Sequence, residues 1–160
     1  MEITAQVPGA NGNPELVKLA GDCIRAQSID PDSAQGRQKV IELVGEIARQ
    51  PKAGFSGKWL FRGSVKWSNI TSTYTEPVVG IASCNESGSS LTMISEGGKY
   101  QVNFSGALKG GRISGQFGFS AGTEIASTKC EGAAQTSRIV LTGHSQTPDG
   151  GFQAAITFLR

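Results

Sequence analysis

The sequence offers few residue types that could carry out catalysis. His144 is its only histidine, and it is not part of a convincing set of catalytic side chains. The acids Glu76 and Glu124 could serve as a general base only if a barrel buried them, and Tyr100 could add one polar group. We therefore predict no catalytic residues, and we rank an enzyme of the barrel isomerase or cyclase type last among three hypotheses.

The cysteines are the next candidates for chemistry. Cys23, Cys84 and Cys130 do not have metal-ligand spacing, so with one histidine the sequence predicts no metal site, and we expect no cofactor. Cys84 and Cys130 are each predicted to end a strand just before a polar turn, which for Cys130 is Glu131-Gly132, and this makes them a candidate disulfide. On a round barrel they would lie on opposite sides, so the pair requires a flattened barrel or a different strand count. Cys23 as one partner, or three free thiols, are the alternatives.

Aromatic side chains that alternate with polar ones could line an apolar cavity. The candidate ligand-binding residues are Trp67, Phe61, Tyr100, Phe104, Phe117 and Phe119. A solidly packed core would explain the same alternation. Glycines on the inward face fit both interpretations, because glycine leaves room and also marks barrel bends.

Residues 57–68 alternate with the period of a β-strand half buried against a core. Both tryptophans, Trp59 and Trp67, fall on the inward face. The outward face carries a basic ridge of Lys58, Arg62 and Lys66. We expect this ridge to be solvated, with docking on the N-terminal helices or on an anionic partner as the alternatives.

The same period continues from residue 55 to the end of the chain, interrupted by glycine-rich turns. It predicts about eight antiparallel strands over residues 55–160, arranged as an up-and-down barrel or a flattened barrel. Residues 14–51 predict a helical hairpin, with Asn13 as N-cap and Pro51 as stop signal. Residues 1–13 are expected to be a flexible lead-in. The chain is thus mainly β with an N-terminal helical hairpin, whose apolar face could pack on the barrel or on a partner.

A Gly57-x-Trp59 pattern at the head of the first of eight meander strands resembles the calycin barrels, meaning avidins, lipocalins and fatty-acid-binding relatives. In lipocalins a basic residue from near the chain end packs over that tryptophan, so the resemblance implies this structural role for Arg160. It further implies that Trp59 plugs the closed end of the barrel. Trp67, nearer the opposite rim, is then the better candidate for ligand contact. The helical hairpin departs from the lipocalin pattern, and the resemblance implies a fold rather than a function.

Composition narrows the class of protein further. Charged residues make up 18% of the 160 residues, against a usual level of about 25%, and 22 are glycine. This balance favours a β-rich extracytoplasmic protein, secreted or periplasmic, although the chain shows no signal peptide and no transmembrane segment. A net charge of +2 argues against nucleic acid as a partner.

Two functional hypotheses precede the enzyme. The first is a non-enzymatic binding protein that holds a small apolar or amphipathic ligand inside the barrel. The alternative is a protein-interaction module, such as an assembly factor or inhibitor, with a solid barrel core and a binding surface on the helical hairpin or a strand edge. The sequence makes no prediction of oligomeric state.

Overall fold

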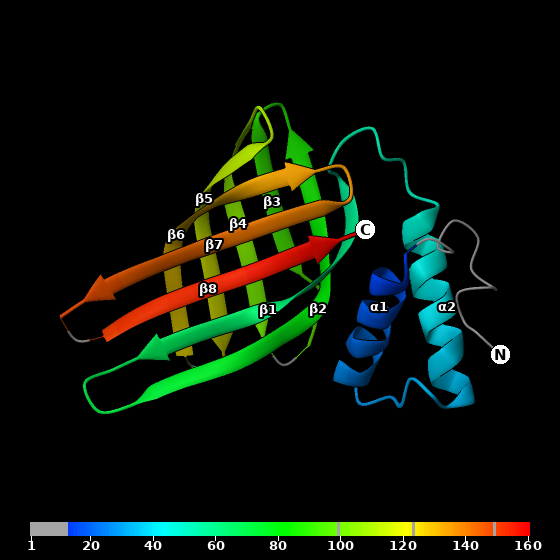
Figure 1. The fold of residues 1–160 in the computed structure, drawn as a ribbon, viewed down its shortest axis with the longest axis horizontal. Coiled ribbons are helices and arrows are strands. Elements are labelled where there is room, and N and C mark those ends of the chain that lie inside the picture. The colour runs from blue at the N-terminus through cyan, green and yellow to red at the C-terminus, as the bar shows by residue number, and fades with distance from the viewer. Residues whose placement is uncertain (1–12, 99, 123, 149) are drawn as a thin grey trace.

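The computed structural model describes residues 13–98, 100–122, 124–148 and 150–160 (Figure 1). Two helices precede eight strands, which confirms the mainly β class with an N-terminal helical hairpin. The elements are α1 (Pro14–Ala26), α2 (Ala34–Ala48), β1 (Gly57–Ser68), β2 (Thr73–Ser87), β3 (Ser90–Ser95), β4 (Gln101–Lys109), β5 (Arg112–Ala121), β6 (Glu124–Gln135), β7 (Arg138–Thr147) and β8 (Gly150–Leu159). Apart from Asn13, the predicted lead-in lies outside the described residues.

Both helices begin with a side-chain cap. The Asn13 Oδ1 accepts a hydrogen bond from the Leu16 backbone N–H at 3.1 Å, and Pro14 occupies the first helical position, where its missing N–H is tolerated. In α2 the Ser33 hydroxyl oxygen accepts from the Gly36 N–H at 3.0 Å. These caps determine where each helix of the hairpin begins. The hairpin presents one apolar face to the barrel.

The strands form a closed barrel in which each pairs with the next in sequence and β8 pairs with β1. The up-and-down barrel is therefore confirmed, as is the fold-level resemblance to calycin barrels. Following register partners from Glu76 around all eight strands returns to β2 at Glu86, ten residues farther along. A barrel of eight staggered strands is just wide enough for its side chains to fill or for one small ligand.

The two ends of the barrel differ. Near the helices, where β1 begins and β8 ends, the neighbouring strands stay paired (Figure 1). Toward the β1–β2 connection, the registers become incomplete: β6 pairs with β7 over residues 130–135, although β6 begins at residue 124. Likewise β2 pairs with β3 over residues 82–87 but with β1 over residues 73–84. We call this splayed end the wide end and the other the closed end.

Two apolar clusters hold the molecule together. The first fills the barrel and includes Trp59, Phe104 and Phe117, all buried. The second lies between the helices and the outer face of the barrel, where Leu60 and Leu159 join the helical residues. The hairpin therefore packs on its own barrel, which decides between the two arrangements left open by the sequence.

Charged groups reinforce this docking. The Lys58 Nζ lies 3.0 Å from the Glu46 carboxylate of α2, and Arg62 pairs with Glu15 of α1. Arg138 pairs with the same Glu15 at 2.8 Å. The expectation of a solvated basic ridge is thus wrong for two of its three members, because the helices supply carboxylates opposite them. Lys66 is exposed, as expected.

Candidate functional site

The closed end is sealed by Trp59 and Arg160. The Trp59 indole is fully buried, and its Nε1 donates to the Phe55 carbonyl at 2.8 Å. The Arg160 guanidinium lies 4.5 Å from the centroid of the Trp59 ring, within the range of a cation–π interaction. Its Nε donates to the Thr136 carbonyl at 2.7 Å, and its Nη2 donates to the Gly54 carbonyl. At this end Arg160 therefore covers the buried Trp59 ring and ties the end of β8 to the chain before β1.

Backbone geometry at the start of β1 supports the plug. Gly57 has a φ of +129°, a region that side-chain-bearing residues rarely adopt. The next residue, Lys58, is clamped by Gln50, whose side chain accepts from its N–H at 2.6 Å and donates to its carbonyl at 2.8 Å. Glycine at position 57 thus lets the chain turn from the helices into the barrel and present Trp59 inward.

The middle of the barrel is packed. Three of the candidate ligand residues, Phe61, Phe104 and Phe117, are buried in the interior cluster. They touch other core side chains, as in the contact of Phe61 with Phe158 at a centroid distance of 5.7 Å. The structure does not bring these three to an opening.

The wide end brings the other candidates together. The Phe119 ring lies 5.7 Å from that of Trp67 and 5.4 Å from that of Tyr100, and Trp67 stacks on Tyr74 at 5.6 Å. Phe119 also stacks on Phe152 at 6.2 Å. Because β1 and β5 are opposite walls of the barrel, these rings form an aromatic layer across its wide end.

An apolar hollow of about 490 Å³ opens on this layer. Its lining combines buried rings with side chains at the rim: Trp67, Ser68, Asn69, Tyr74, Phe119, Ile125, Ala126, Gly151 and Phe152. The hollow lies where β6 has parted from β7. Sequence periodicity identified Trp67 and Phe119 as ligand candidates and placed Phe152 on the inward face, but it missed Tyr74 and Ile125.

Two polar side chains that the structure describes at this end lie in contact. The Tyr100 hydroxyl donates to the Glu76 carboxylate at 2.8 Å, so two of the three polar residues singled out from the sequence lie in contact. The side chain of Glu124 lies outside the described residues. Glu76 supplies an acid and Tyr100 a phenol, but this pair by itself supplies no nucleophile and is therefore not a complete catalytic set.

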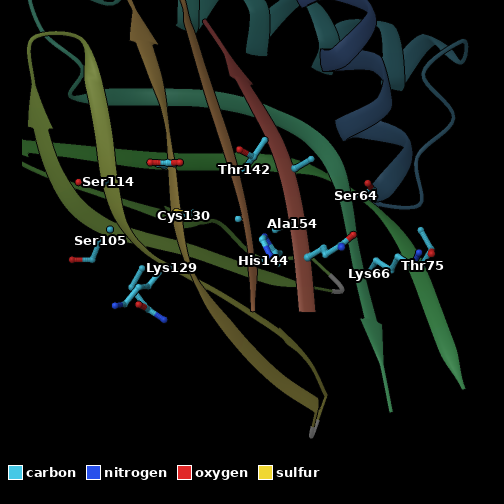
Figure 2. Close-up of a pocket in the computed structure, with 16 residues that line it drawn as sticks. Ser64, Lys66, Thr75, Ser105, Ser114, Lys129, Cys130, Thr142, His144 and Ala154 are labelled. Atoms are coloured by element: carbon cyan, nitrogen blue, oxygen red, sulfur yellow. The ribbon is translucent and has the colours of Figure 1, made fainter. Parts of the chain in front are cut away.

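A second, larger depression of about 1000 Å³ lies on the outer face of the barrel (Figure 2). Its lining is mostly exposed hydroxyl, amide and charged side chains, including Lys66, Lys129, Glu131 and His144. Figure 2 shows these residues spread over several strands. Ligand pockets are sheltered and lined mainly by apolar and aromatic side chains, so we place the candidate site at the smaller apolar hollow.

The predicted disulfide is not supported. All three cysteines are free and buried, and Cys84 on β2 and Cys130 on β6 lie four strands apart in either direction around the barrel. The expected turn at Gly132 is also wrong, because β6 continues to Gln135. Without the disulfide, the extracytoplasmic prediction depends on composition alone.

Burial raises the pKa values of all three thiols. It raises the pKa of Cys23 to about 12, with a further contribution from Asp22, and that of Cys130 to about 11. For Cys84 burial is again the main cause, and the pKa rises to about 12. The Cys23 thiol also donates to the Gly80 carbonyl at 3.2 Å.

We predict that the native protein will react slowly with 5,5′-dithiobis(2-nitrobenzoate) at pH 8, where raised pKa values keep the thiols protonated. After denaturation without reductant, the three free cysteines should all react. A single reactive thiol in the denatured protein would show instead that two cysteines are bonded.

Comparisons with known proteins add little beyond the fold. No family model matches the chain, and no curated protein does. A solved structure of a tryptophan-to-alanine mutant of transferrin-binding protein B, a vaccine antigen from Haemophilus parasuis Hp5, is similar with a TM-score of 0.48 and 11% identity. The match covers 68% of this chain but 27% of that one. At this level it carries no argument about function.

No group of three or more His, Cys, Asp or Glu side chains is placed to hold a metal ion within the described ranges. Neither described helix is long and apolar enough to span a membrane.

Proposed function

We propose that the protein is a non-enzymatic binding protein that takes a small apolar or amphipathic ligand in the hollow at the wide end. The observation that carries this proposal is the aromatic layer of Trp67, Phe119 and Phe152, which lines a hollow with a volume of about 490 Å³. That volume falls within the range of about 300–1,000 Å³ typical of ligand pockets. The ligand would lie at the wide end, since the middle of the barrel is filled by its own side chains.

Exposed apolar side chains around the hollow support the same site. Ile125 is 81% exposed at its rim, and Ile70 is equally exposed in the neighbouring β1–β2 connection. Apolar groups gathered beside a hollow mark a binding surface more often than scattered ones do. A ligand that covered Ile125 would remove this surface from water.

The Ile125 side chain provides a direct test. Replacing Ile125 by serine should weaken binding of the neutral dye N-phenyl-1-naphthylamine about fivefold, since losing about 1 kcal/mol of apolar contact changes a dissociation constant by that factor. Dye fluorescence during titration with protein measures the affinity. Stability should change little, because the side chain is exposed.

Ile94→Ser is the matched control. Ile94 is also exposed, at 57%, but it lies on β3 and does not line the hollow. Its replacement should leave dye affinity unchanged. Equal losses in both variants would mean that the dye binds nonspecifically to exposed apolar groups and would contradict the proposal.

The exposed isoleucines also favour the alternative of a protein-interaction module. In that case Ile70, Tyr74 and Ile125 would contact a partner protein at the wide end. The helical hairpin is less suited to this role because its apolar face is already covered by the barrel. Failure of the dye to bind the native protein would favour this alternative. An extracytoplasmic location stays a prediction under either function.

A further inference from the structure

Five side chains at the wide end lie next to one another in a ring. Glu76 accepts a hydrogen bond from Tyr100, Tyr100 contacts Phe119, Phe119 contacts Trp67, and Trp67 stacks on Tyr74. Tyr74 and Glu76 are two residues apart on β2, which places them on the same face and roughly 7 Å apart. Trp67, Tyr74 and Phe119 of this group line the hollow, and the Tyr100 ring and the Glu76 carboxylate lie next to them.

The carboxylate belongs to the inward face of the barrel. The register partner of Glu76 on β1 is Val65, which is fully buried, so the residues at this level face the interior. The ion pairs among the described residues involve Glu15, Asp22, Glu46 and Glu96 as the acids, and none involves Glu76. The Tyr100 hydroxyl that donates to this carboxylate brings no positive charge to it.

The lysines that the structure describes near this level of the barrel face its outer surface rather than the hollow. Lys66 follows Val65 along β1, and it lines the outer depression rather than the hollow. Lys129 on β6 lines the same outer surface. Arg160 is the buried cation of the barrel, but it lies at the closed end over Trp59. As far as its side chains are described, the wide end therefore combines the carboxylate of Glu76 with the electron-rich faces of aromatic rings.

We propose that the ligand of this site is an amphipathic cation, a molecule with an ammonium head and an apolar tail. This inference rests on the proposed function and specifies its ligand class. The tail would occupy the hollow against Phe119 and Phe152, and the head would lie against Tyr74 and Trp67, near the Glu76 carboxylate. Aromatic faces attract cations through their quadrupole, and Trp does so most strongly. A fatty-acid anion would be repelled by Glu76.

Three ligands of equal tail length test the charge preference: octyltrimethylammonium, 1-octanol and octanoate. Displacement of N-phenyl-1-naphthylamine from the native protein measures each affinity. We expect the cation to bind about tenfold more tightly than the alcohol, as expected for a partly desolvated cation–π contact with a nearby carboxylate. Octanoate should bind most weakly.

Glu76→Gln separates charge from shape. The amide oxygen can still accept from Tyr100, so the aromatic layer should remain in place. The variant should lose most of the tenfold preference for the cation and keep its affinity for 1-octanol. Glu131→Gln is the matched control, because Glu131 is an exposed carboxylate on the outer face; its replacement should leave the preference unchanged.

The outcomes distinguish this inference from the proposed function. Equal affinity for octyltrimethylammonium and 1-octanol would overturn the cation assignment while leaving an apolar ligand site. Failure of all three ligands to displace the dye, or failure of the dye to bind, would overturn the proposed function itself. The comparison in the native protein requires no variant, so it remains decisive if Glu76→Gln does not fold.

Discussion

Replacing Arg160 by alanine is expected to lower the free energy of unfolding by about 3 kcal/mol, a large effect for one residue. Its side chain is only 3% exposed. It donates to the carbonyls of Thr136 and Gly54, and it covers the Trp59 ring. Hydrogen bonds from charged groups contribute about 1.5–3 kcal/mol each, and the cost of burying the guanidinium offsets part of this gain. Burial also lowers the pKa of Arg160 from its usual value.

Urea denaturation followed by tryptophan fluorescence measures the loss. Arg112→Ala is the control, because Arg112 is exposed at the start of β5 and should contribute less than about 0.5 kcal/mol. Arg160→Lys should be intermediate, since an ammonium keeps the charge but not the planar fork that reaches two carbonyls. Equal stability of Arg160→Ala and Arg112→Ala would contradict the role of Arg160 as a plug.

The alternation of side chains was sufficient to predict the barrel. Period two from residue 55 onward, with glycine turns such as that at Gly110 and Gly111, predicted eight strands in meander order, and the barrel has that order. The caps at Asn13 and Pro14 predicted the first helix. These signals are local, which is why a single sequence contains them.

The candidate site could be predicted only in part, because periodicity gives the face of a residue and not its level in the barrel. Phe117 and Phe119 share a face and differ by one repeat. Phe117 is buried in the core, whereas Phe119 meets Trp67 across the wide end. The level at which two distant strands meet depends on the ten-residue stagger from Glu76 to Glu86. That stagger is a property of the closed sheet as a whole.

Glycines are a second reason why the sequence predicted the strands only in part. Gly132 predicted a turn, but it lies within β6, where a Cβ atom would come within 1.7 Å of the Val140 carbonyl oxygen. It therefore marks close approach of two strands. A turn glycine and a bend glycine look alike in sequence. The false turn at Gly132 also made Cys130 look like the end of a strand and thus a disulfide candidate.

Replacing Gly115 by alanine should destabilise the barrel by more than about 3 kcal/mol or prevent folding, because the added methyl has no space and its neighbours are backbone. A Cβ atom at Gly115 would lie 2.3 Å from the Ser105 carbonyl oxygen and 2.5 Å from the Gly106 Cα atom. Gly106 is its register partner on β4, so the two glycines let the strands come together at this level. Relief of the clash would require moving β4 away from β5.

Gly21→Ala in α1 is the matched control with the opposite sign. Its Cβ would meet its nearest neighbour, Pro31, at 3.9 Å, an ordinary van der Waals contact. Alanine is favoured over glycine within a helix by up to about 1 kcal/mol, so this variant should be as stable as the native protein or more so. Urea denaturation of both variants tests the pair. If Gly115→Ala were as stable as Gly21→Ala, the two strands could not approach as closely as the register of β4 and β5 requires.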